Sequence, residues 1–98
     1  MDCILEKDNV IVKFDKHLDM TSIQDAFIML KKAFDYNKPI LLQVNEITRL
    51  DTAGLQLLLS FYLAAHEKKI TIQWEAPSAI LVEIAKILNL YKLLKLSL

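Results

Sequence analysis

Three residues with the clearest chemical potential lie close together: a carboxylate at Asp51, a hydroxyl at Thr52 and the chain's only glycine at Gly54. An apolar segment of strand length precedes them and an apolar segment of helical length follows. They are therefore expected at a helix N-terminus, where free backbone N–H groups and a partial positive charge favour anions. A phosphate near Thr52 could accept hydrogen bonds from such N–H groups.

Both Thr52 and Gly54 also have purely structural interpretations. Threonine and aspartate are preferred helix N-caps, and the spacing alone favours Thr52 as a cap. Glycine can mark a tight contact between helix and strand, or a point where a partner protein or phosphate comes close to the backbone. The two interpretations of each residue are compatible with one another.

No pattern of residues in the sequence indicates an enzyme. Nucleotide-binding loops of the Walker and dinucleotide types need several glycines, and the chain has one. His17 and His66 are possible bases, but neither has a nucleophile or a carboxylate at a telling spacing. With Cys3 they form no zinc-ligand pattern. We expect no catalysis, no metal and no cofactor.

The composition suits a single α/β domain over residues 1–98 with one core, because 54% of the residues are hydrophobic. The formal net charge is zero, which gives no general attraction to nucleic acid or to an anionic membrane. Cys3 is the only cysteine, as suits a reducing compartment. The sequence shows no signal peptide. It also shows no apolar run that approaches the length of about 18 residues needed to span a membrane. We expect a cytoplasmic protein without direct membrane insertion.

The N-terminal half begins with two short runs typical of strands, residues 3–6 and 10–14, which predict an edge hairpin. A helix is expected over 21–35, opened by a capping box that starts at Thr21. Residues 40–44 form a nearly continuous apolar run, which predicts a central strand covered on both faces. The buried face of the helix is predicted to hold Ile23, Ala26, Phe27, Leu30, Ala33 and Phe34.

The C-terminal half predicts a helix over 52–67, a strand over 70–74 and a helix over 78–89. Asn89 is expected as a left-handed C-cap. The alternation of strands and helices predicts a mixed, mainly parallel sheet of four or five strands with about four helices. The predicted buried positions are Leu55, Leu58, Tyr62 and Ala65 in the first helix and Leu81, Ile84, Ala85 and Leu88 in the second.

The outer side of the 52–67 helix is unusually apolar for a solvent face. A partner-docking surface would explain this, and Met20 and Trp74 could join it. Alternatively, the apolar tail over 90–98 folds over this face and enlarges the core. The residues on this side are Gln56, Leu57, Ser60, Leu63 and Ala64.

The sequence resembles the STAS domain family, named after sulphate transporters and anti-sigma factor antagonists. The resemblance rests on Leu50 to Leu55, with Ile47-Thr48-Arg49 before them and Leu57-Leu58-Leu59 after them. Leu18-Asp19 and Thr21 resemble the family's Leu-Asp-x-x-Thr segment with one residue missing. Pro77-Ser78 through Leu88-Asn89-Leu90 resemble its last helix and the following turn.

This resemblance implies a phospho-regulated binding module. In anti-sigma factor antagonists a partner serine/threonine kinase phosphorylates the hydroxyl residue after the motif aspartate, which corresponds to Thr52 here. The unphosphorylated form binds the anti-sigma factor and thereby regulates transcription in bacteria. Here the acceptor is Thr in place of the usual Ser, and Ala53 replaces a frequent second hydroxyl residue. The implied partner-binding residues are Asp19, Arg49, Asp51, Thr52, Ala53, Gly54, Gln56, Leu57, Ser60 and Leu63.

Two other members of the family offer alternatives. Asp-Thr-Ala-Gly forms are similar to the cytoplasmic STAS subunit of an ABC phospholipid transporter, which docks on the ATPase subunit. Similar small proteins also accompany chemotaxis systems.

Overall fold

The computed structural model describes residues 1–75, 79–87 and 89. They form a four-stranded sheet, a separate pair of very short strands and three helices, where about four helices were predicted. The elements are β1 (Asp2–Leu5), β2 (Val10–Lys13), β3 (His17–Leu18), α1 (Ile23–Asp35), β4 (Ile40–Gln43), β5 (Arg49–Leu50), α2 (Thr52–Glu67), β6 (Ile72–Glu75) and α3 (Ala79–Ile87).

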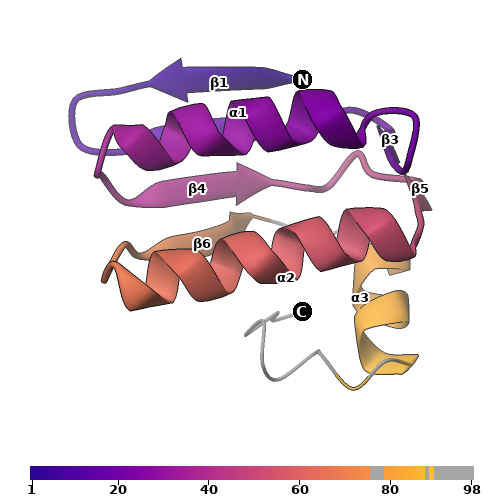
Figure 1. The fold of residues 1–98 in the computed structure, drawn as a ribbon. Coiled ribbons are helices and arrows are strands. Elements are labelled where there is room, and N and C mark those ends of the chain that lie inside the picture. The colour runs from indigo at the N-terminus through magenta and orange to yellow at the C-terminus, as the bar shows by residue number, and fades with distance from the viewer. Residues whose placement is uncertain (76–78, 88, 90–98) are drawn as a thin grey trace.

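The sheet has the order β1-β2-β4-β6, and only the β1–β2 pair is antiparallel. The predicted hairpin and the mixed, mainly parallel sheet are therefore confirmed. The prediction for the central strand is also confirmed, because β4 pairs with β2 on one side and β6 on the other. Figure 1 shows α1 and α2 side by side in front of the sheet, both beginning at the end where β3 and β5 lie.

The core lies between these two helices and the sheet. Val10, Ile40 and Leu42 are buried on the covered face, together with Val12. On the opposite face Leu41 is only half-buried, so the described residues cover β4 completely on one face and not on both as predicted.

Helix α1 is rotated relative to the predicted stripe. Its buried residues are Ala26, Met29, Leu30 and Ala33, while Phe27 is 53% exposed. The prediction that Phe27 is buried is wrong, because apolar residues occupy more than one side of this helix and their period alone does not select the core side.

Each of the described helices has a residue with positive φ just after its end: Asn37, Lys69 and Asn89. The predicted left-handed conformation of Asn89 is confirmed. After α2 the amide of Lys69 donates to the His66 carbonyl and that of Ile70 to the Ala65 carbonyl, a Schellman arrangement. Ile70 therefore belongs to the end of the helix, and β6 starts at Ile72, two residues later than predicted.

The helix bounds otherwise agree closely with the predictions. Helix α2 matches the predicted range of 52–67, and its buried residues include Leu55, Leu58 and Ala65, as predicted. Tyr62 is half-buried, and the neighbouring Phe61 takes the core position. In α3, Leu81 and Ala85 are buried and Ile84 is half-buried. The predictions for Pro77, Ser78, Leu88 and the tail over 90–98 lie outside the described residues.

Candidate functional site

The candidate site lies where α2 begins, beside the short strands β3 and β5. These strands are parallel, with His17 opposite Arg49 and Leu18 opposite Leu50. This pairing brings the loop after β3 next to the first turn of α2. The predicted position of Thr52 at the helix N-terminus is confirmed, since Thr52 is the first residue of α2, and its side chain is exposed.

The N-cap of α2 is Asp51 and not Thr52. One oxygen of the Asp51 carboxylate accepts a hydrogen bond from the Gly54 amide at 2.9 Å, and the other accepts from the Met20 amide, also at 2.9 Å. The carboxylate therefore caps the helix and ties the loop after β3 to it. The interpretation of Thr52 as the N-cap is therefore wrong. The Thr52 hydroxyl does not cap the helix.

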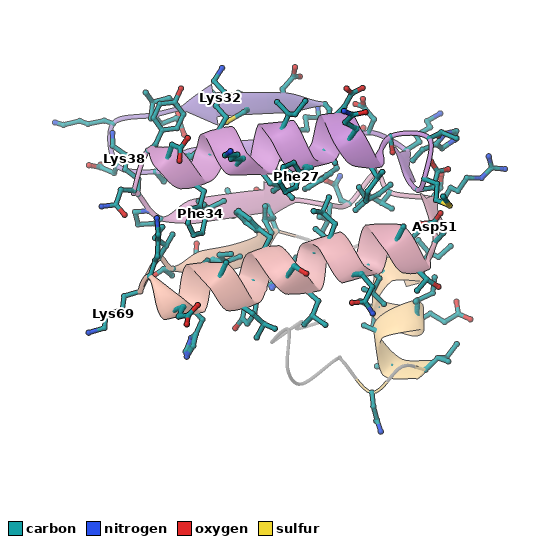
Figure 2. The ribbon with its side chains drawn as sticks, in the orientation of Figure 1. Phe27, Lys32, Phe34, Lys38, Asp51 and Lys69 are labelled. Atoms are coloured by element: carbon teal, nitrogen blue, oxygen red, sulfur yellow. The ribbon has the colours of Figure 1, made fainter. Side chains whose placement is uncertain are left out.

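Figure 2 labels Asp51 at the start of α2, at the end of the molecule opposite Lys38 and Lys69. The Leu55 amide donates to the Asp51 carbonyl. The first two amides of the helix, those of Thr52 and Ala53, have no acceptor among the described residues. They can therefore supply a partial positive charge next to the Thr52 side chain.

Gly54 is needed for a contact inside the molecule. A Cβ atom at this position would lie 2.1 Å from the Leu18 carbonyl oxygen and 2.9 Å from its carbonyl carbon. Gly54 is buried and its φ is not positive, so the backbone conformation does not require a glycine here. The absence of a side chain at Gly54 lets β3 pack directly against α2. This is the tight contact between helix and strand that was one interpretation of Gly54 from the sequence. The expected contact between Gly54 and a partner stays a prediction beside this structural role.

Asp19 is also held inside the fold, with 8% of its surface exposed. Its carboxylate accepts hydrogen bonds from both the amide and the hydroxyl of Thr21. The Thr21 hydroxyl is the main cause of a lowered pKa of Asp19, to which the nearby charges of His17 and Arg49 contribute. These bonds give Asp19 a structural role in the loop before α1, and its expected contact with a partner stays a prediction.

The predicted capping box of α1 does not form, because its residues bond elsewhere. Thr21 donates to Asp19, and the N-cap is Ser22, whose side chain makes no cap bond. The Ser22 hydroxyl instead donates to the His17 carbonyl at 3.0 Å and accepts from the Asp19 amide at 3.2 Å. The loop between β3 and α1 is thus closed by its own side chains.

The remaining predicted partner-binding residues are at least partly accessible. Ala53 and Leu57 are half-buried, and Met20, which was expected to join the surface, is 75% exposed. Trp74 is half-buried and stacks on Tyr62, with 6.3 Å between ring centroids, so it packs against α2. The exposed members of the predicted set are Arg49, Thr52, Gln56, Ser60 and Leu63.

The candidate bases are not brought together. His17 lies in β3 and His66 near the end of α2, at opposite ends of the helix pair. Burial raises the pKa of the Cys3 thiol, which disfavours the reactive thiolate. Among the described residues no group of three or more metal-ligating side chains occurs. None of the described helices has both the length and the apolar character required to cross a bilayer.

The fold and the site define a small α/β domain with a capped helix start beside an exposed hydroxyl. The family model of the STAS domain matches residues 4–98, and the chain belongs to this family. A comparison with curated proteins found no match. Among solved structures, the chain is similar to the NMR structure of the protein TM1081, with a TM-score of 0.71 and 20% identity over 92% of this chain and 74% of that one. Family membership indicates a regulatory or interaction module.

The division of tasks between Asp51 and Thr52 leads to a stability prediction. Asp51→Ala should lower the free energy of unfolding by about 1–3 kcal/mol, since it removes both the cap and the bond to the Met20 amide. Thr52→Ala should change it by less than about 0.5 kcal/mol. Urea denaturation of both variants measures the difference. A larger loss in Thr52→Ala than in Asp51→Ala would contradict the assignment of the cap.

The lowered pKa of Asp19 predicts a dependence of stability on pH. The folded-state pKa of Asp19 lies below its ordinary value of 3.8. The ionised Asp19 therefore contributes fully to the free energy of unfolding above pH 3.8, and this contribution is lost as the pH falls through the folded-state pKa. Thr21→Val removes the hydroxyl and should raise the Asp19 pKa towards its ordinary value. Carboxyl NMR titration measures this pKa, with the exposed Thr71→Val as control. An equal Asp19 pKa in both variants would contradict the assigned cause.

Proposed function

We propose that this protein is a non-enzymatic regulatory module that binds another protein and is switched by phosphorylation of Thr52. In this proposal it acts in the cytoplasm as an antagonist of an anti-sigma factor, and its partner is that factor or another serine/threonine kinase. The observation that carries the proposal is the exposed Thr52 hydroxyl at the start of α2, where Asp51 already provides the cap.

A phosphate at this position would leave the fold intact. Negative charge in the first turn of a helix is stabilising, and the amides of Thr52 and Ala53 are available to it. Phosphorylation adds about −1.5 to −2 charge at neutral pH beside the Asp51 carboxylate. The switch would therefore act through the charge of the partner-facing surface and not through unfolding.

The proposed contact surface surrounds Thr52 on three elements. Met20 belongs to the loop before α1, Arg49 to β5, and Gln56 to the next turn of α2. All three side chains are exposed. An unphosphorylated Thr52 in this setting presents a small, neutral group, which a partner surface can cover at low desolvation cost. A phosphothreonine there would need its own counter-charges.

The outer face of α2 favours a second candidate. Leu63 is 46% exposed and Ala64 is exposed, which suits a constant docking contact that needs no switch. The partner would then be the ATPase subunit of an ABC lipid transporter. A role beside chemotaxis proteins would be a further form of the same interaction.

Phosphosite mapping tests the proposal. The protein is purified from its native cells during growth and after growth arrest, and tryptic peptides are quantified by mass spectrometry. We expect phosphate at Thr52 in one state and none at Ser60 or Thr71, which are exposed hydroxyls without the motif aspartate. Unmodified Thr52 in both states would count against the switch. Co-purification of an ABC ATPase in place of a kinase would then support the second candidate.

A further inference from the structure

An apolar groove runs between α1 and α2, away from Thr52. Its volume is about 350 Å³. It extends over about two turns of each helix, from Phe27 to Phe34 on one side and from Leu57 to Ala64 on the other, which is about 10 Å of helix length. The other lining residues are Leu30, Lys31, Ser60 and Phe61.

Aromatic rings form much of this groove. Phe34 and Phe61 pack edge to face, with 5.8 Å between ring centroids, and Phe61 is buried. Figure 2 shows Phe27 and Phe34 pointing from α1 towards α2. Phe27 lines the groove and is 53% exposed, a large exposed fraction for an aromatic side chain. The fold thus leaves apolar surface between the helices that a further element could cover.

The charged side chains beside the groove are cationic. Among the described residues Lys31 is the only charged one that lines it, and the Lys68 ammonium lies 4.8 Å from the centroid of the Phe34 ring. Within the described chain neither ammonium makes an ion pair with a carboxylate. The acidic residues of the same helix ends, Asp35 and Glu67, do not line the groove. An occupant with carboxylates facing these two lysines would be complementary in charge.

We propose that this groove binds an amphipathic helix of a partner protein that carries acidic residues beside its apolar stripe. Two neighbouring helices offer a third helix a groove for ridges-into-grooves packing, with apolar residues at i, i+4 and i+7 as anchors. Carboxylates flanking these anchors would pair with Lys31 and Lys68. The proposal does not depend on phosphorylation of Thr52, because Thr52 does not line the groove and neither Lys31 nor Lys68 lies at the start of α2.

The test uses two synthetic helical peptides of about 15 residues. Both have Leu at spacings of three and four, and the flanking positions are Glu in one and Lys in the other. Binding is measured by fluorescence anisotropy and located by NMR chemical shifts. We expect the Glu peptide to bind at least tenfold more tightly, with shifts at Phe27, Leu57 and Ala64. The net charge of the protein is zero, so a general attraction would not produce this preference.

Pairs of matched variants on α1 compare residues that line the groove with neighbouring residues that do not. Lys31→Glu should weaken binding of the Glu peptide at least tenfold, while Lys32→Glu, outside the groove, should change it less than twofold. Phe27→Ala should weaken it about tenfold. Ile28→Ala, which removes a side chain of similar exposure outside the groove, should not.

Several results would overturn the proposal. These are absence of binding, equal binding of the two peptides, and equal effects of Lys31→Glu and Lys32→Glu. A wild-type dimer that Phe27→Ala dissociates in sedimentation velocity would assign the groove to a second copy. Dodecanoate binding with shifts at the same residues, without peptide binding, would assign it to an acyl chain. Circular dichroism verifies that each variant is folded.

Discussion

Gly54→Ala is expected to lower the free energy of unfolding by more than about 3 kcal/mol. This is the largest effect on stability that we predict. The added Cβ would lie 2.1 Å from the Leu18 carbonyl oxygen. This oxygen belongs to the backbone of β3, which is held by its pairing with β5, so it cannot move as a flexible side chain would. The strand and the helix would have to separate.

Two companion variants make this prediction specific. Gln56→Val places a β-branched side chain on the exposed side of the same helix and should cost only about 0.5 kcal/mol through helix propensity. Leu18→Ala removes the side-chain atom that would lie 3.0 Å from the added Cβ but leaves the carbonyl oxygen in place. It should therefore not rescue Gly54→Ala. Chemical denaturation that finds Gly54→Ala as stable as the wild type would refute the contact.

Thr52→Glu is expected to weaken binding of the partner about tenfold, which corresponds to about 1.4 kcal/mol, while the protein stays folded. The first turn of α2 accepts a negative charge, so the melting temperature should be unchanged or slightly higher. Thr52→Gln, of similar size but neutral, should bind almost like the wild type. Its comparison with Thr52→Glu separates the effect of charge from that of size.

The measurement is titration with the partner that wild-type protein recovers from native cells. Thr71→Glu is the control, because Thr71 is exposed just before β6, at the opposite end of the molecule from Thr52. It should not change the affinity. Equal weakening by Thr71→Glu would show a general charge effect and no switch at Thr52.

The sequence predicted the regular elements well, because long helices and the central strand have clear apolar patterns. The range of α2 and the interior position of β4 follow from such patterns. The pair formed by β3 and β5 was not predicted. Two-residue strands have no measurable period, and His17 and Arg49 are far apart in the chain. Without this pair, a tight contact of Gly54 with a strand could be considered, but Leu18 could not be identified as the residue it contacts.

At the site, the sequence identified the motif but assigned the cap to the wrong residue. Asp51 and Thr52 are both good N-caps by type, and only the bonds to the Gly54 and Met20 amides decide between them. Asp19 was expected on the partner surface because of the family resemblance, which carries no information on its bonds. The bonds from the amide and hydroxyl of Thr21 could not be predicted from the sequence.

The most direct test of the proposed switch compares unmodified protein with protein that carries phosphothreonine at position 52, introduced by genetic encoding. The affinity of both forms for the recovered partner is measured by isothermal titration calorimetry, and melting temperatures verify the fold. We predict a dissociation constant at least tenfold higher for the phosphorylated form, with no loss of stability. Equal dissociation constants for the two folded forms would contradict the switch.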